Sequence, residues 1–559
     1  MATLLDPTSN EQKYSKLTSA VIIGATTADR TRIWVRVYQE GKWSLVVTKA
    51  PLSGDLVRLE EKSVKDFLAG NGIVPVYLGE SDITQDSNLT HVFEVAGLDA
   101  DTRYYYALIS VSTDTAVIRR RTEIGADAPQ SFRTMPAAPS SLVFGFYSCH
   151  DHISASGDVG AWPHFSEQLK DANAHFVIGG GDQAYVDTNN KNGFLDIWTW
   201  LKDNKTALLE KFALGNGKYD EAGIELYLLN IYRWYYRVYW NVPALREVFE
   251  RFPQYMIWDD HEIMDGWGSL TNSERRARIS GFFEEKDSKT NQLLVELMWR
   301  AACRAYYEYE HSHNPVTSVD LGRPDDCQWD YGFRHGDAAF YVLDMRGHHD
   351  VEKNKNKKTD IDPNIILGRA QVERFAAWLA GNEAKSAKVL FVVSPVPVLH
   401  WIDRLVNYVD LGEAKDDFMD EWGHESNWTE RNQLLEMIFK RIDKSGRKLV
   451  FLSGDVHCAS VFRMQHRKFP AARVYQVTSS AISRKPAPKI SMLGISSGGA
   501  MDGNDDVSCE RLYALTGAKN FAMIQVRSVY QGSESEVVVD LHWPGGEEGE
   551  VTKRRIVLA

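Results

Sequence analysis

Six short apolar runs, spaced along the chain from residue 141 onward, most constrain how this sequence folds. Each run is long enough for one buried strand, and helices are expected between them, as at residues 161–171, 368–381 and 429–444. Strands that alternate with helices are typical of a layered α/β core. The predicted strands cover residues 143–147, 175–179, 255–258, 339–343, 389–393 and 448–452.

The segment before this core has a different pattern. Runs of Val, Ile, Tyr and Phe are separated by polar, Gly-containing turns, which is typical of a β-sandwich. Residues 97–106 resemble the tyrosine corner of fibronectin type III and immunoglobulin-like sandwiches, in which a Tyr hydroxyl binds the backbone a few residues upstream. We therefore expect a β-sandwich over residues 16–136 and one large α/β domain over residues 141–559.

The length of 559 residues would suit roughly three to four domains of about 150 residues, whereas this interpretation uses two. Two helical inserts, near residues 193–251 and 270–313, and two long loops, one that contains Lys353 and one over residues 483–506, account for the extra length. The first insert carries a stripe of Tyr and Trp over residues 232–240. We interpret the stripe as core packing, because aromatic side chains bury large apolar areas.

Charge and cysteine content exclude several classes of protein. The 64 basic and 76 acidic residues give a net charge of −12, which argues against specific nucleic-acid binding and against anionic membranes as partners. No apolar run reaches the ~18 residues of a membrane span, and the first twenty residues lack the pattern of an export signal. Five scattered cysteines without a C-x-x-C pair fit a reducing compartment. The sequence thus predicts a cytoplasmic protein and leaves its oligomeric state open.

Polar, metal-capable side chains follow four of the predicted strands, at the ends where open α/β sheets bind ligands. Taken singly, an Asp at such a place is often a helix cap, and a His is more often a satisfied polar residue than a ligand. Four motifs in this order predict a metal site, because a cation relieves the repulsion among clustered carboxylates. The motifs are Ser-Cys-His-Asp-His at 148–152, Gly-Gly-Asp-Gln-Ala-Tyr at 180–185, Trp-Asp-Asp-His-Glu at 258–262 and Ser-Gly-Asp-Val-His at 453–457.

Together with Leu-Asp-Met-Arg at 343–346, these motifs resemble those of the PhoD-like (alkaline phosphatase D) family of metallophosphatases, within the calcineurin-like metallophosphoesterase superfamily. The resemblance covers most of the chain and implies a four-layer αββα core preceded by a fibronectin- or immunoglobulin-like β-sandwich. It also implies an enzyme that hydrolyses a small-molecule phosphate ester, as a phosphomonoesterase, a phosphodiesterase or both. The expected nucleophile is a metal-bound hydroxide.

The resemblance further assigns a metal to named residues. A ferric ion, Fe3+, is expected on the residues that match the iron ligands of the family, which are Cys149, Asp182, Tyr185 and His457. Trivalent iron favours hard anionic oxygens, which the carboxylate and the phenolate supply. His150 and His152 flank Cys149, and whether either lines the site stays open.

A second cation, Ca2+ by the resemblance and zinc, manganese or magnesium as alternatives, is expected on three carboxylates: Asp182, Asp260 and Asp455. His261 is the expected general acid, and Arg346 matches an arginine that lies near the phosphate in the family. The chain departs from the family where Asp-Asp-His-Glu continues as Ile-Met-Asp-Gly. Asp265 is therefore an alternative ligand, and the number of metals at the second site stays open.

Two other functions are alternatives to a phosphatase. One is a binding protein led by the β-sandwich, with an inactive α/β domain, which predicts that some ligands are missing. The other is a metal-dependent hydrolase of non-phosphate esters. All six expected metal ligands are present in the sequence, which favours an active enzyme over a binding protein. Assays of phosphate and carboxylate esters separate the two hydrolases.

Overall fold

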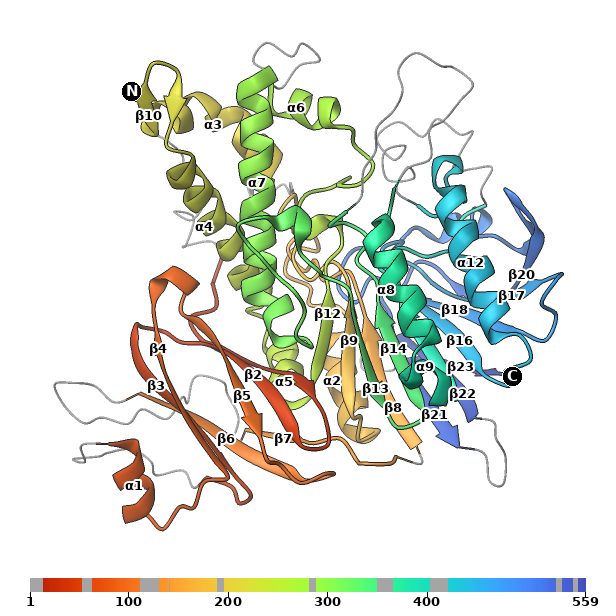
Figure 1. The fold of residues 1–559 in the computed structure, drawn as a ribbon, viewed down its shortest axis with the longest axis horizontal. Helices are drawn as coiled ribbons and strands as arrows, with labels where there is room; N and C mark the ends of the chain where they lie inside the picture. The colour runs from red at the N-terminus through yellow and green to blue at the C-terminus, as the bar shows by residue number, and fades with distance from the viewer. Residues whose placement is uncertain are drawn as a thin grey trace.

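The structure is a computed structural model, and its fold is drawn in Figure 1. Within the residues that it describes, the strands form two sheets near the N-terminus, two large sheets in the rest of the chain and one small hairpin. The described residues are 14–52, 63–110, 130–139, 141–188, 196–280, 288–348, 365–402, 421–528, 535–545 and 551–559.

Two antiparallel sheets, red to orange in Figure 1, precede the larger sheets. Their apolar side chains meet in one buried cluster, which includes Ile33, Leu45 and Tyr104. The Tyr104 hydroxyl accepts a hydrogen bond from Asp99 N–H at 2.8 Å, which is the contact predicted for a tyrosine corner. The sheet orders are β1 (Ala20–Thr26), β2 (Arg30–Arg36), β5 (Thr90–Ala96), and β4 (Tyr77–Ile83), β3 (Gly41–Thr48), β6 (Arg103–Ser110), β7 (Ser131–Arg133), with helix α1 at Val64–Gly70.

A six-stranded mixed sheet contains three of the predicted strands, and each agrees with its prediction to within two residues. These three strands are parallel, and the other three pair antiparallel. The sheet order is β12 (Gln254–Ile257), β9 (Phe176–Gly180), β8 (Ser141–Tyr147), β21 (Phe521–Ser528), β22 (Ser535–Pro544), β23 (Val551–Leu558).

An eight-stranded sheet contains the other three predicted strands, now β14, β15 and β16, which run parallel. The sheet order is β13 (Tyr331–His335), β14 (Ala338–Val342), β15 (Val389–Val393), β16 (Lys448–Ser453), β18 (Arg473–Ser479), β17 (Ala459–His466), β20 (Asn504–Leu515), β19 (Gly498–Met501). The prediction of a long loop over residues 483–506 is wrong, because that range holds a short 3-10 helix at Lys489–Leu493, β19 and the start of β20. The predicted loop that contains Lys353 lies outside the described residues. The Gly-Gly-Ala-Met sequence of β19 lacks the β-branched and aromatic residues that indicate a strand.

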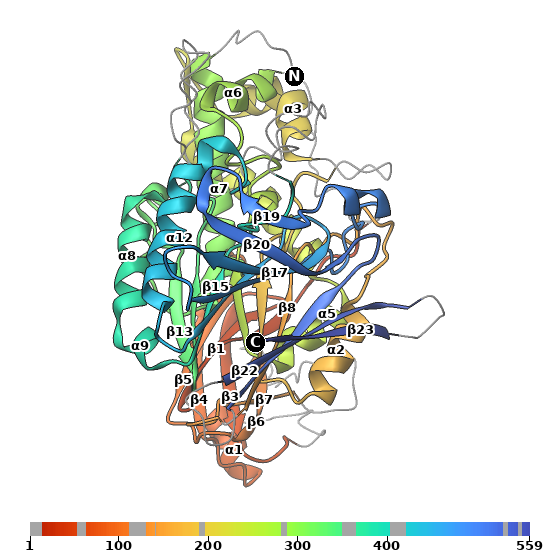
Figure 2. The same ribbon diagram turned by 90° about the vertical axis from the view of Figure 1, so that its right-hand side faces the viewer.

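The two large sheets pack face to face through aromatic rings. The Phe144 ring of β8 lies 5.5 Å from Phe340 of β14 and 5.3 Å from Phe391 of β15, measured between ring centroids. Helices α8 (Gly368–Ala380) and α12 (Trp428–Ile442), with the short α9 (Asn382–Ser386), cover the outer face of the eight-stranded sheet. Helix α2 (Trp162–Asp171) covers the six-stranded sheet, where Phe165 packs against Gly145. Figure 2 shows these helices on opposite sides of the strands.

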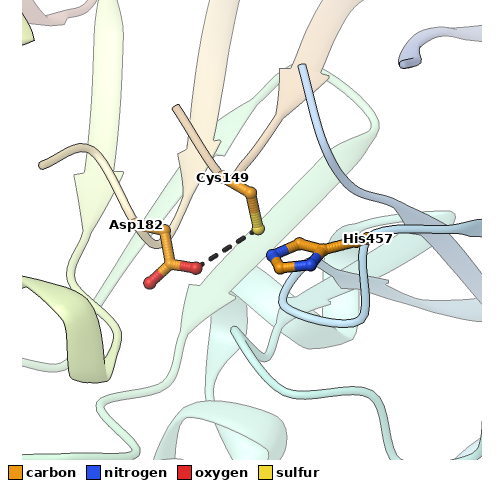
Figure 3. Close-up of side chains that lie close together, drawn as sticks. All are labelled: Cys149, Asp182 and His457. Atoms are coloured by element: carbon orange, nitrogen blue, oxygen red, sulfur yellow. Dashed lines mark hydrogen bonds between the residues drawn. The ribbon is translucent and has the colours of Figure 1, made fainter. Parts of the chain in front are cut away.

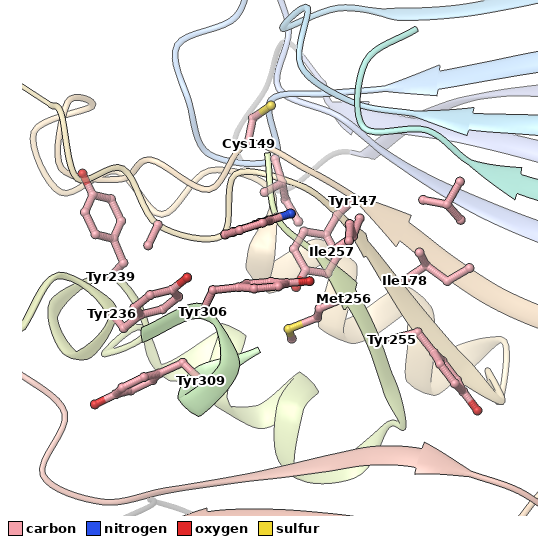
Figure 4. Packing of buried hydrophobic residues seen from close by; sticks show 14 of the residues in the cluster. Tyr147, Cys149, Ile178, Tyr236, Tyr239, Tyr255, Met256, Ile257, Tyr306 and Tyr309 are labelled. Carbon is pink, nitrogen blue, oxygen red and sulfur yellow. The ribbon is translucent and has the colours of Figure 1, made fainter. Parts of the chain in front are cut away.

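Helices occupy most of the described residues in the two regions predicted to be helical, and a small hairpin interrupts the first; α3, α4, α6 and α7 lie at the upper left of Figure 1 and α5 lies lower. The aromatic stripe on α4 is buried, as predicted, and Tyr236 stacks on Tyr309 of α7 with ring centroids 4.8 Å apart (Figure 4). No helix in the described part of the chain combines the length and the apolar character needed to cross a membrane. The elements are α3 (Ile197–Lys211), β10 (Ala213–Gly215), β11 (Lys218–Tyr219), α4 (Glu221–Tyr239), α5 (Pro243–Arg251), α6 (Asn272–Ser280) and α7 (Ser288–Tyr309).

Candidate metal centre

The carboxyl ends of β8, β9, β12 and β16 meet at one place between the two large sheets. The backbone N–H of Cys149, after β8, donates to the carbonyl oxygen of Gly181, after β9, at 3.2 Å. Gly454, after β16, approaches β8 so closely that a Cβ there would clash with Ser148. Five of the predicted ligands follow these strand ends directly: Cys149, Asp182, Asp260, Asp455 and His457.

Asp182 is shared by three groups of side chains whose ligand atoms lie within 4.8 Å of one another. Figure 3 shows the first group, in which the Cys149 thiol lies 3.3 Å from Asp182 Oδ2 and His457 faces both. A second group contains only carboxylates, and a third adds His261. The groups are Cys149, Asp182, His457, then Asp182, Asp259, Asp260, Asp455, then Asp182, Asp260, His261.

Tyr185 also lies at this cluster, as the motif after β9 predicts. Its hydroxyl donates to Asp182 Oδ2 at 2.9 Å, and its ring centroid lies 4.0 Å from that of His261. The side chains of Tyr185 and Asp182 are both buried. The structure therefore brings every residue predicted to bind metal into one region, in which Asp455 and His457 are half-buried.

Four of the clustered residues have backbone in the left-handed region, where φ is 58° at Cys149, 60° at Asp182, 64° at Asp455 and 52° at His457. Non-glycine residues rarely adopt this conformation. It persists where the surrounding structure enforces it, and it concentrates at functional sites. Four of the residues predicted to bind metal therefore also have a backbone conformation that is common at functional sites.

Burial sets the protonation of the cluster. It raises the pKa of Cys149 and of Tyr185 well above their ordinary values, and the nearby Asp182 carboxylate raises both further. Burial also raises the pKa of Asp182 and of Asp259. The same burial lowers the pKa of His457 to about 3, so its imidazole is neutral at pH 7 and able to bind metal. A bound cation would favour the deprotonated forms of the acidic groups.

Two carboxylate oxygens of the cluster are among the buried atoms that have no hydrogen-bond partner in the described residues: Asp182 Oδ1 and Asp259 Oδ2. Both side chains are buried, and leaving a buried acceptor unpaired costs about 1–3 kcal/mol. Coordination to a cation would satisfy both oxygens. Sulfur, imidazole and carboxylate donors around Cys149 suit a transition metal, whereas the all-carboxylate group suits a hard cation. The residues present therefore fit the metals expected from the sequence.

His261 is held by a carboxylate that the sequence analysis did not assign. Its Nδ1 lies 2.8 Å from Oδ2 of Asp187. Burial acts to lower the pKa of His261, but the charges of Asp187, Asp260 and Asp182 outweigh it and raise that pKa well above its ordinary value. Asp187 lies two residues beyond the motif at 180–185, and this nearness to the motif is the only signal for it in the sequence.

The departure from the family pattern places Asp265 beside Asp187, to which its backbone N–H donates. Burial raises the pKa of Asp265 to about 6. Asp265 belongs to none of the three groups found among the described residues. Both ring nitrogens of His150 already have hydrogen-bond contacts, with Ser483 Oγ at 2.9 Å and with the Tyr239 carbonyl oxygen at 2.8 Å. Neither nitrogen is therefore available to bind a metal.

Two arginines border the cluster, and the sequence analysis identified only one. Arg346 is 1% exposed and pairs with Asp259 and with Asp260, the latter at 3.6 Å. Its contact with a substrate phosphate stays a prediction. Arg484, which follows β18, was missed because its loop carries no motif. Its guanidinium pairs with Asp151 and lies 4.7 Å from the centroid of the Tyr185 ring.

A cluster of thiol, phenol, imidazole and carboxylate groups at the ends of sheet strands is typical of α/β metal-dependent hydrolases. Residues 144–507 match the family model described as PhoD-like phosphatase. The chain therefore belongs to the PhoD-like phosphatase family.

Individual relatives are distant. An uncharacterized protein of Saccharomyces cerevisiae is 24% identical over 378 residues, which cover 57% of this chain and 50% of that protein. Alkaline phosphatase D of Bacillus subtilis is 24% identical over 381 residues, which cover 66% of this chain and 53% of that protein. The chain thus spans about half the length of these curated relatives. A solved structure described as that of PhoD superposes with a TM-score of 0.61 at 18% identity, covering 96% of this chain and 89% of the other, which shows a shared fold.

Proposed function

We propose that this protein hydrolyses small-molecule phosphate esters at the cluster centred on Asp182. The observation that carries the proposal is the environment of that carboxylate, which is shared by three groups of ligand atoms and retains an unpartnered buried oxygen. Family membership supports the reaction class. The fold likeness supports the expected αββα core and the sandwich before it as parts of the same proposal.

The proposed metals divide by donor chemistry. Cys149, Asp182, Tyr185 and His457 would hold a ferric ion, and the carboxylates of Asp182, Asp260 and Asp455 would hold calcium or another divalent cation. Asp259 joins the second set as a ligand or as a partner of Arg346. When bound, such ions lower the pKa of water and offset the charge of a phosphate.

The protein's own groups would complete the reaction. His261 is the proposed general acid for the leaving group, because Asp187 on Nδ1 leaves Nε2 as its second nitrogen for a substrate. Arg346 positions Asp259 and Asp260 through ion pairs with both carboxylates. Its Nη1 also donates to the Trp267 carbonyl oxygen at 2.8 Å. The burial of these groups strengthens their mutual interactions.

One experiment tests the reaction class. Purified protein is assayed with an aryl phosphate, a bis-aryl phosphate and an aryl carboxylate ester, and the metals of the same sample are measured. Turnover of either phosphate ester with bound metal supports the proposal. Turnover of the carboxylate ester alone would favour the second hydrolase, and metal-free protein without turnover would favour a binding protein.

Replacing the shared carboxylate gives a sharper prediction. Asp182→Asn should lower turnover by about 1,000-fold or more and lose both metals, because the ligand common to all three groups becomes neutral. Metal-stripped Asp182→Asn should melt at or above metal-stripped wild type, because the amide removes a buried charge that lacks a cation. Differential scanning calorimetry and metal analysis measure both effects.

The matched control is Asp330→Asn, since Asp330 is an equally buried carboxylate that pairs with Arg374. It should lower the melting temperature, because it weakens an ion pair, and it should keep its metals. Equal metal loss in the two variants would contradict the assignment of Asp182.

A further inference from the structure

Arg484 is fixed beside the metal centre by its backbone. The loop after β18 returns to the end of β8, where the N–H groups of Arg484 and Ser483 donate to the Cys149 carbonyl oxygen at 3.1 and 3.4 Å. The Ser483 hydroxyl contacts His150 Nδ1 at 2.9 Å. The main chain of this loop therefore cannot move without disturbing the cluster.

The side chain of Arg484 is oriented by two contacts. One Nη pairs with the buried carboxylate of Asp151, and the guanidinium lies 4.7 Å from the centroid of the Tyr185 ring. Asp151 already accepts hydrogen bonds from the hydroxyl groups of Thr188 and Tyr239, each at 3.2 Å. Arg484 is thus a cation held between an anchor on one side and a proposed metal ligand on the other.

The side chain of Arg484 is more exposed to solvent than that of Arg346. The Arg346 side chain is 1% exposed and its donors face Asp259, Asp260 and the Trp267 carbonyl oxygen. The Arg484 side chain is 27% exposed, and among the described residues its Nε and Nη2 make no hydrogen bond. Arg484 therefore retains donors on a side chain that is partly exposed to solvent.

We propose that Arg484 binds a phosphoryl oxygen of the substrate and favours phosphate monoesters over diesters. The inference rests on the proposed function and adds its substrate class. Guanidinium groups hold phosphate through directed, charge-assisted hydrogen bonds. A monoester presents up to two negative charges and three non-bridging oxygens, whereas a diester presents one charge and two such oxygens. An additional cation at the edge of the site therefore stabilises a bound monoester more.

The test measures equilibrium binding to the metal-loaded protein, with inorganic phosphate as the monoester probe and dimethyl phosphate as the diester probe. Arg484→Ala should raise the Kd of inorganic phosphate about 10- to 100-fold and that of dimethyl phosphate by about threefold or less. Arg484→Lys keeps a cation beside Asp151 and should melt near wild type. Its phosphate Kd should still rise, because a point charge lacks the planar fork of an arginine.

Arg467→Ala is the matched control, since Arg467 pairs with Asp506 on an exposed hairpin and its side chain is 72% exposed. It should leave both dissociation constants unchanged. Unchanged phosphate binding in both Arg484 variants would overturn the inference and leave the proposed function intact. Equal losses for the two probes, or no phosphate binding by wild type, would also overturn it. Phosphate binding without hydrolysis of any phosphate ester would instead count against the proposed function.

Discussion

The backbone at Cys149, Asp182, Asp455 and His457 is strained, because left-handed conformations of non-glycine residues cost about 1–2 kcal/mol each. This conformation places four side chains from three strand ends close together. Burial raises the pKa of the thiol and of the phenol. At the scale of single residues, a bound cation would therefore supply the free energy that deprotonates both groups.

Tyr185→Phe tests the identity of the first metal. A phenolate bound to ferric iron absorbs visible light, so wild-type protein should be coloured and the variant should lose the visible band. The hydroxyl that donates to Asp182 at 2.9 Å is the one removed. An absorption spectrum with iron analysis of the same sample measures the change.

Tyr239→Phe is the control for the colour. Tyr239 is equally buried and its hydroxyl contacts Asp151 at 3.2 Å, outside the three groups of ligand atoms. This variant should keep the visible band. Colourless, fully active wild-type protein with zinc in both positions would contradict the iron assignment.

At the scale of elements, the six strands β8, β9, β12, β14, β15 and β16 could be predicted, because each is a short apolar run between polar residues. The residues directly after β8, β9, β12 and β16 could also be predicted as neighbours, since parallel strands bring their carboxyl ends together. Asp187 and Arg484 could not be assigned, because their roles depend on how loops fold back over the strand ends. Asp259 was present in the predicted motif, but its pairing with Arg346 requires the second sheet.

The close approach of β8 and β16 makes Gly454 an element-scale test. Its Cβ would clash with Ser148 and lie 3.0 Å from the Gly180 carbonyl oxygen, so Gly454→Ala should push the strand ends apart. We expect a fall of about 1–3 kcal/mol in stability and partial loss of metal. Thermal unfolding and metal analysis measure both.

Gly322→Ala is the control for this substitution, because Gly322 is exposed and the atom nearest to its Cβ would be a flexible Asp320 oxygen at 3.2 Å. It should keep metal content and stability close to wild type. Full metal content in Gly454→Ala would show that the centre tolerates a wider gap between the strands.

At the scale of the whole molecule, the N-terminal sheets are joined to the α/β part by buried polar contacts. Trp34 of β2 donates from Nε1 to the Glu308 carbonyl oxygen of α7 at 2.6 Å, and Tyr255 of β12 donates to the Thr26 carbonyl oxygen of β1 at 3.1 Å. Gly24 of β1 packs against His313, in the short 3-10 helix at His311–His313. The junction therefore encloses the titratable side chains of His311 and His313 in a buried interface.

These histidines predict acid sensitivity of the junction. Burial, with a smaller contribution from the charge of Arg32, lowers the pKa of His311 and His313 to about 3, against about 6.5 in an unfolded chain. Below pH 6.5 the unfolded chain binds more protons, so the stability from the neutral histidines is complete above that pH. It is lost as the pH falls toward 3, at about 1.4 kcal/mol per pH unit for each histidine.

His313→Leu isolates one of the two contributions. Neither ring nitrogen of His313 has a hydrogen-bond partner among the described residues, so the substitution removes a titrating group without breaking a hydrogen bond. The drop in melting temperature between pH 7 and pH 5 should be smaller than in wild type. His164→Gln, whose side chain is 24% exposed on α2, should follow wild type. If the melting temperature of His313→Leu fell as much as that of wild type between pH 7 and pH 5, His313 would not be a source of the acid sensitivity.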